Sequence, residues 1–186
     1  GYKTMSTLKV NSIIPTAGVP TGGGGGVVQT TVTNKTDTAS QSSVSTSSFW
    51  SLESIIKGTI TPTSASSKVL VRMMINLGIN ENTTITGALV RNIGGSETLL
   101  VADDANNRTE TTTSMNIDSD HEMGAMHLTY LDSPSTTSAV SYYLRLTQMT
   151  GGSRNLFVNR SSIDTDSSDN SYPRGVSTVI LQEVSA

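Results

Sequence analysis

The chain has 186 residues, of which 34% are hydrophobic, 15% charged and 4% aromatic, with no cysteine and a formal net charge of −3. It contains 28 serines and 28 threonines while helix-favouring residues are scarce, so a helix-rich fold is disfavoured. The absence of cysteine excludes disulfide scaffolds and thiolate metal sites. The chain has no Lys/Arg cluster and no apolar run near the roughly 20 residues that span a bilayer, so we expect neither nucleic-acid binding nor membrane insertion.

The N-terminal segment predicts an arm on a tether. Its apolar residues follow the alternation of a single strand: Leu8, Val10, Ile13 and Ile14. Because a single strand needs a partner, we interpret residues 1–21 as a docking arm, with a disordered terminus as the alternative. The glycine run 22–26 predicts a flexible linker. It lacks the Lys and Ser/Thr of a phosphate-binding loop and leads into a strand, which favours a tether over a phosphate site.

From residue 27 to the C-terminus, β-type segments recur between turn-rich spacers. The predicted strands are 27–33, 52–60, 68–79, 85–91, 97–101, 122–131, 139–148, 156–159 and 176–184. About nine strands without a long helical pattern indicate an all-β fold, an antiparallel β-sandwich or jelly roll formed by residues 27–186. A hairpin is expected around Gly94 and Gly95. Residues 69–75 are apolar at nearly every position, which predicts a strand buried on both faces or at a subunit contact.

Two long polar spacers, 102–120 and 160–174, are candidate receptor-binding loops, because loops of this length usually carry function or are disordered. Their Ser, Thr, Asn, Asp and Tyr side chains suit hydrogen bonding to sugar hydroxyls. The candidate contact residues are Asp103, Asp104, Asn106, Asn107, Asp164, Asp166, Asn170 and Tyr172.

Metal-binding and catalytic patterns are weak. Asp164, Asp166 and Asp169 form a calcium candidate, since hard cations take oxygens at alternating loop positions, but the loop lacks the glycine and glutamate of an EF-hand. A solvated acidic turn is the alternative. His121 and His127 would lie about 20 Å apart on a continuous strand, too far to share a metal. We therefore expect no catalytic residue and no cofactor.

Stretches spread over nearly the whole chain carry a family resemblance. They are residues 5–14, 22–30, 60–71, 130–134, 158–162, 172–174 and 177–184. These stretches resemble virion structural proteins of tailed phages from marine and cyanobacterial settings, tail-fibre-like proteins in particular. The resemblance implies a non-enzymatic particle component, made in the host cytoplasm and located in the virion. The order of elements is similar to complement-type (C1q/TNF-like) jelly rolls, which trimerise through one sheet face.

Two functions follow from this resemblance. In the first, the chain is a homotrimeric fibre or knob that is anchored to other virion proteins by its arm and contacts a host-surface glycan or protein. In the second, it is a capsid decoration or cement protein whose arm adds strands along the capsid. A glycan-degrading enzyme is a third option, disfavoured because one Trp, two Phe and five Tyr give little aromatic lining for a sugar groove.

Overall fold

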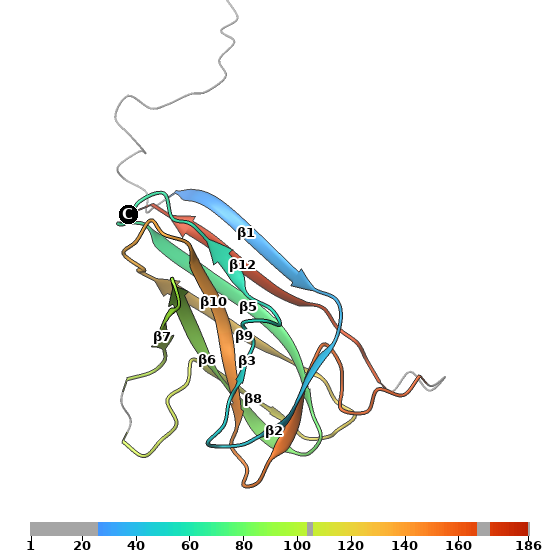
Figure 1. The fold of residues 1–186 in the computed structure, drawn as a ribbon. Coiled ribbons are helices and arrows are strands. Elements are labelled where there is room, and N and C mark those ends of the chain that lie inside the picture. The colour runs from blue at the N-terminus through green and yellow to red at the C-terminus, as the bar shows by residue number, and fades with distance from the viewer. Residues whose placement is uncertain (1–25, 104–105, 167–171, 186) are drawn as a thin grey trace, which may run out of the picture.

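The computed structural model describes residues 26–103, 106–166 and 172–185, and within them the chain folds into twelve β-strands (Figure 1). The strands are β1 (Val27–Lys35), β2 (Ala39–Val44), β3 (Trp50–Ser51), β4 (Gly58–Ile60), β5 (Lys68–Ile79), β6 (Thr83–Ile93), β7 (Ser96–Leu100), β8 (Thr113–Ile117), β9 (Gly124–Asp132), β10 (Val140–Gln148), β11 (Arg154–Val158) and β12 (Ser177–Val184). The predicted docking arm, with Leu8, Val10, Ile13 and Ile14, lies outside the described residues.

Two antiparallel sheets pack face to face. Sheet A has the order β1-β12-β5-β11-β2, with β9 on the other side of β5, and sheet B has the order β3-β10-β6-β7, with β4 on β10 and β8 on β6. After β5 in sheet A, the chain crosses to sheet B for β6 to β8, returns for β9 and crosses again for β10. The predicted fold class, an antiparallel β-sandwich of the jelly-roll kind, is confirmed.

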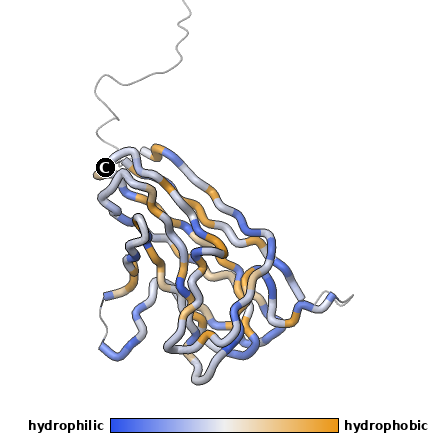
Figure 2. The backbone as a smooth tube through the Cα atoms, in the orientation of Figure 1, coloured by the Kyte–Doolittle hydropathy of each residue, from blue (hydrophilic) through white to orange (hydrophobic). Residues whose placement is uncertain are grey.

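Alternation along the strands places the core between the sheets. In β5 the odd-numbered side chains Val69, Val71 and Ile75 are at most 1% exposed, whereas Leu70 and Met74 point to the outer surface and are only partly buried. Figure 2 shows the same alternation of hydrophobic and hydrophilic positions along several strands. The burial on both faces that the sequence predicts for residues 69–75 is therefore not found within this chain, since one face of β5 remains uncovered.

The predicted strand 52–60 is wrong over most of its length. The amides of Ile55 and Ile56 donate to the carbonyl of Leu52 at 3.0 and 2.8 Å, which closes a tight turn before the short β4. Leu52 and Ile56 are buried by this turn at 0% and 4% exposure, so their hydrophobicity serves the core without a strand. The hairpin expected at Gly94 and Gly95 is confirmed: both glycines have positive φ, and β6 and β7 pair directly around them.

Asp132, a buried carboxylate at the end of β9, links the two sheets. Arg91 Nη1 donates to its carboxylate oxygens at 2.9 and 3.2 Å, and the Tyr142 hydroxyl donates at 2.7 Å. Arg91 and Tyr142 belong to sheet B, and Asp132 belongs to sheet A. Burial, followed by the hydrogen bond to Asp132, raises the pKa of Tyr142, so the phenol stays protonated and remains a donor.

Glu183 in β12 is a second buried carboxylate at the same end of the sandwich, because both it and Asp132 pair with Val69. Its side chain is 0% exposed and accepts from Gln29 Nε2 at 2.7 Å and from the amide and hydroxyl of Thr63 at 2.8 and 2.7 Å. Burial alone would raise the pKa of Glu183, but the hydrogen bonds from Gln29, Ser67 and Thr63 outweigh it and lower the pKa to about 2. The loop before β5 is thereby fixed to β1 and β12.

Candidate functional site

The two candidate receptor loops lie on opposite sides of the sandwich. The loop between β7 and β8 projects at the left of Figure 1, and the loop between β11 and β12 projects at the right. Asp103, Asn106 and Asn107 are exposed in the first loop, and Asp164 and Asp166 are exposed in the second. These two groups therefore do not form one continuous surface. Asp104 and Asn170 lie outside the described residues.

The first predicted loop is shorter than the sequence indicates, because β8 lies inside the spacer 102–120 and pairs with β6. The part after β8 turns toward the second loop. The carbonyl of Asp120 accepts from the amides of Ser162 and Ile163 at 3.0 and 3.3 Å, and the rings of His121 and Tyr172 lie 5.4 Å apart. Tyr172 is thus placed beside the end of the first spacer and far from its start.

The calcium candidate is partly engaged by arginine. The Asp164 carboxylate accepts from Arg174 Nε and Nη2 at 3.0 and 2.9 Å, and Arg160 Nε lies 4.0 Å from it. No group of three or more His, Cys, Asp or Glu side chains that could hold a metal ion occurs within residues 26–103, 106–166 and 172–185. Asp169, the third member of the candidate, lies outside these ranges.

The outer face of sheet A is uncovered and carries apolar side chains between polar ones, since exposed Arg72 lies between Leu70 and Met74 and pairs with Thr129 and Ile180. The cross-strand register puts Leu131 of β9 next to Leu70 of β5, and Ile180 of β12 next to Val32 of β1. Leu131 and Val32 are 51% and 57% exposed. We call the face formed by β9, β5, β12 and β1 the apolar sheet face, defined by Val32, Leu70, Met74, Leu131 and Ile180.

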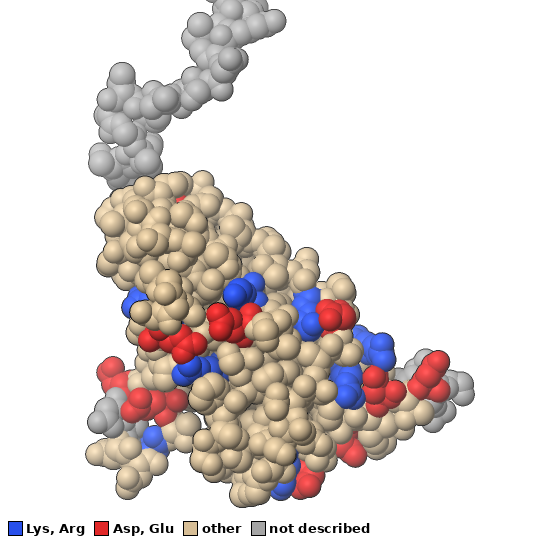
Figure 3. Space-filling model, viewed as in Figure 1, with Lys and Arg blue, Asp and Glu red and all other residues tan. Residues whose placement is uncertain are grey.

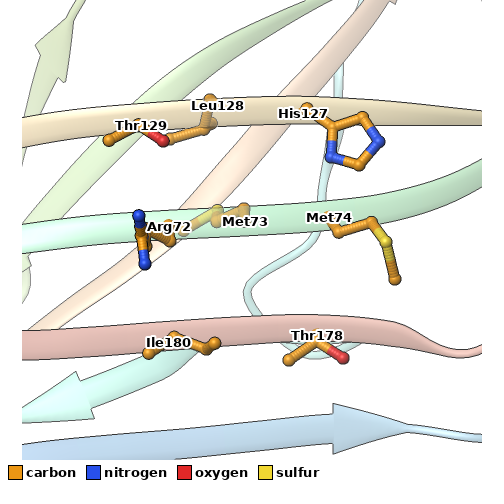
Figure 4. A pocket seen from close by; sticks show the side chains of 8 residues that line it. All are labelled: Arg72, Met73, Met74, His127, Leu128, Thr129, Thr178 and Ile180. Atoms are coloured by element: carbon orange, nitrogen blue, oxygen red, sulfur yellow. The ribbon is translucent and has the colours of Figure 1, made fainter.

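A shallow hollow of about 230 Å³ lies on this face between β9, β5 and β12 (Figure 4). His127 and Met74 are neighbours in the β9–β5 register, and Figure 4 shows their side chains close together at one end of the hollow. Arg72 and Ile180 lie at the other end. His127 therefore stands on a sheet surface among apolar and hydroxyl side chains.

A second hollow of about 230 Å³ crosses the outer face of sheet B. We call it the sheet B groove; it is lined by Phe49, Thr86, Ala88, Leu99, Thr109, Glu110, Thr111, Arg145 and Thr147. Phe49 and Leu99 are large apolar side chains that are 53% and 47% exposed. Neither Phe49 nor Leu99 is among the site residues that the sequence predicts. Phe49 precedes a strand of only two residues, so no periodic pattern indicated which way its ring points.

Comparisons with known proteins give limited similarity. No protein-family model matches the chain, and no curated protein matches its sequence. Among solved structures, the chain is similar to the infectious bursal disease virus Gx strain structure, with 11% identity over 85% of this chain and a TM-score of 0.39. It is also similar to the infectious bursal disease virus VP2 subviral particle, with 13% identity over 86% of this chain and a TM-score of 0.36.

The chain spans 40% and 39% of the length of those two chains. TM-scores below 0.5 do not assign it to their fold family. Within the described residues, no helix is long and apolar enough to cross a membrane.

Proposed function

We propose that the chain is a non-enzymatic structural protein of a phage virion, a homotrimeric fibre or knob that is anchored by its N-terminal arm and contacts the host surface. The observation that carries the proposal is the apolar sheet face. The sequence resemblance to tailed-phage virion proteins is the reason for placing the chain in a phage particle. The sandwich fold suits a compact domain that the particle displays on its surface. A capsid decoration protein is the alternative.

The apolar sheet face favours self-association. Large apolar side chains that remain exposed close together on a sheet often mark contacts with other proteins, and Leu131 and Val32 on this face are more than half exposed. Leu70, Met74, Leu131 and Ile180 come from three adjacent strands, so a second copy of the chain would meet a broad surface and not a single side chain. Packing identical copies through this face would complete the burial that the sequence predicts for residues 69–75.

The end of the sandwich where β1 begins suits attachment to a particle. The amide of Ser185 donates to the carbonyl of Gly26 at 3.1 Å, so the start of β1 and the end of β12 lie together. Figure 3 shows that this end is almost free of charged side chains on the face in view, while charged groups gather lower on the molecule. Val27 and Val28 add exposed apolar surface there, at 57% and 48% exposure. An arm leaving this end would bring a surface with few charges toward its partner, with the exposed Lys68 beside Val184.

The oligomeric state tests the proposal directly. Light scattering of the full chain at micromolar concentration is expected to give the mass of three chains. Met74→Lys should shift the mass to that of one chain, because it replaces an apolar contact with a second positive charge on a face that already carries Arg72. Ser40→Lys, which adds the same charge at an exposed position of β2, is the matched control and should remain a trimer. A wild-type monomer would refute self-association.

The position of the protein on the particle distinguishes the fibre proposal from the capsid decoration alternative. Intact particles are labelled with gold-conjugated antibody against residues 27–186 and viewed by electron microscopy. Label at the tail or on projecting fibres is the expected result. Label spread evenly over the head would establish the decoration alternative, and no label on any particle would remove the virion assignment.

A further inference from the structure

The sheet B groove has the shape of a small open binding site. Its floor comes from two paired strands: the small side chains of Thr86 and Ala88 in β6 lie opposite Thr147 and the long Arg145 in β10. Phe49, next to β3, forms one wall, and Leu99 of β7 with the loop before β8 contributes to the other. Its volume of about 230 Å³ is below the roughly 300–1,000 Å³ typical of pockets for drug-sized ligands, so it suits one small ring.

The loop side of this groove is fixed in place. The amide of Thr112 and the hydroxyl of Thr111 both donate to the carbonyl of Gly87 in β6, at 3.0 and 2.9 Å. The Thr112 hydroxyl donates to the carbonyl of Leu100 at 2.6 Å. Residues 109–111 therefore stand against β6, and Glu110 is exposed at the groove. A site formed this way needs little ordering when a ligand enters.

Phe49 is the aromatic wall of the groove. The guanidinium carbon of Arg145 lies 4.3 Å from the centre of its ring, and this cation–π contact orients the ring. Arg145 is itself paired with Glu97, which also accepts from the Tyr143 hydroxyl. The guanidinium covers one face of the ring, and its charge is matched by Glu97, so the part of the ring that stays exposed has surroundings with little excess positive charge.

The chemistry of the lining selects the class of ligand. The Thr86 and Thr147 hydroxyls are hydrogen-bonded to each other at 2.6 Å and the Thr111 hydroxyl donates to the Gly87 carbonyl, so these three leave mainly acceptor lone pairs for a ligand. The Glu110 carboxylate is a further acceptor at the groove. An anion would meet Glu110 and an arginine already neutralised by Glu97, whereas a purely apolar ligand would cover the Glu110 carboxylate without giving it a hydrogen bond. A neutral sugar matches both parts, since its C–H face packs on an aromatic ring while its hydroxyls hydrogen-bond.

We infer that the sheet B groove binds one neutral hexose unit of a host-surface glycan, with the sugar ring against Phe49 and its hydroxyls at Thr147 and Glu110. This inference rests on the host contact in the proposed function and moves that contact from the acidic loop residues to the face of sheet B. The groove uses only residues 109–111 of the predicted loop 102–120.

The test is binding of the full chain to immobilised neutral oligosaccharides of glucose, galactose and mannose, with sialylated and sulfated oligosaccharides as anionic probes. At least one neutral probe should bind. Phe49→Ala should weaken that binding on the order of tenfold, the scale of one aromatic contact. Thr147→Val, which removes a hydroxyl at constant shape, should also weaken it. Val176→Ala, which trims an exposed apolar side chain outside the groove, should bind as wild type does.

Binding of anionic probes alone, failure of every neutral probe, or unchanged binding by Phe49→Ala would overturn the inference. The particle-labelling experiment distinguishes failure of the groove inference from failure of the proposed function. Labelled particles without sugar binding would refute the groove only. Sugar binding that depends on Phe49 without labelled particles would uphold the groove and refute the virion assignment.

Discussion

Glu183 offers a sharp test of how the end of the sandwich is held together. In Glu183→Gln, one oxygen can still accept from the amide and hydroxyl of Thr63, but the new amide nitrogen faces Gln29 Nε2, which donates to the carboxylate at 2.7 Å. Gln29 cannot simply turn its amide around, because the same nitrogen also donates to the carbonyl of Thr61 at 2.7 Å. The substitution therefore leaves two donors facing each other in a site with no solvent exposure.

The expected cost is the loss of one charge-assisted hydrogen bond together with an unsatisfied buried donor, about 2 kcal/mol. For a domain of this size, that corresponds to a decrease in Tm of about 4–8 °C. The assay is thermal unfolding of Glu183→Gln and wild type at pH 7. Glu122→Gln is the matched control, because Glu122 is exposed, and it should change the free energy of unfolding by less than about 0.5 kcal/mol.

The pH dependence gives the same test a second readout. The pKa of Glu183 is lowered in the folded chain to about 2 from 4.5. A lowered folded-state pKa contributes stability that is present above pH 4.5 and is lost as the pH falls toward 2. The difference in Tm between wild type and Glu183→Gln should therefore be largest near neutral pH and shrink below pH 4.5. A difference no larger than that of Glu122→Gln, or one that stays constant down to pH 2.5, would refute the reasoning.

Two further substitutions test the core. Tyr142→Phe removes the 2.7 Å hydrogen bond to Asp132 and should lower the free energy of unfolding by about 1.5 kcal/mol in denaturant titrations, with an unchanged midpoint as the contrary result. Gly78→Ala would place a Cβ atom 2.3 Å from the carbonyl oxygen of Arg160, which is backbone and cannot move aside, so we expect a loss of about 1–3 kcal/mol or more. A Tm within 1 °C of wild type for Gly78→Ala would show that the two segments separate easily.

The polar strands show where local patterns stop being informative. β2 reads Ala-Ser-Gln-Ser-Ser-Val and β8 reads Thr-Ser-Met-Asn-Ile, and neither has the apolar run that predicts a strand. Both form because a neighbouring strand, β11 or β6, offers unpaired backbone groups that they satisfy. The opposite error occurs at residues 52–60, where apolar side chains are buried by a turn and the sequence predicts a strand.

The site residues divide in the same way. The sequence identified loops rich in hydrogen-bonding groups but could not indicate that Asp103 and Asp164 would lie on opposite sides of the sandwich. It also gave no sign that Phe49 would meet Arg145, which lies 96 residues further along the chain. That contact exists because β3 pairs with β10 and brings Trp50 opposite Leu146.

By itself, the sequence determined the β-sandwich class, the bounds of β5 and the hairpin at Gly94 and Gly95. These features depend on local alternation and turn chemistry, which a short window of residues contains in full. Only the tertiary structure decided which side chains of β5 point outward and which residues line the sheet B groove. Those outcomes depend on the pairing of strands that are distant in the chain, and this pairing is set by how the two sheets pack together.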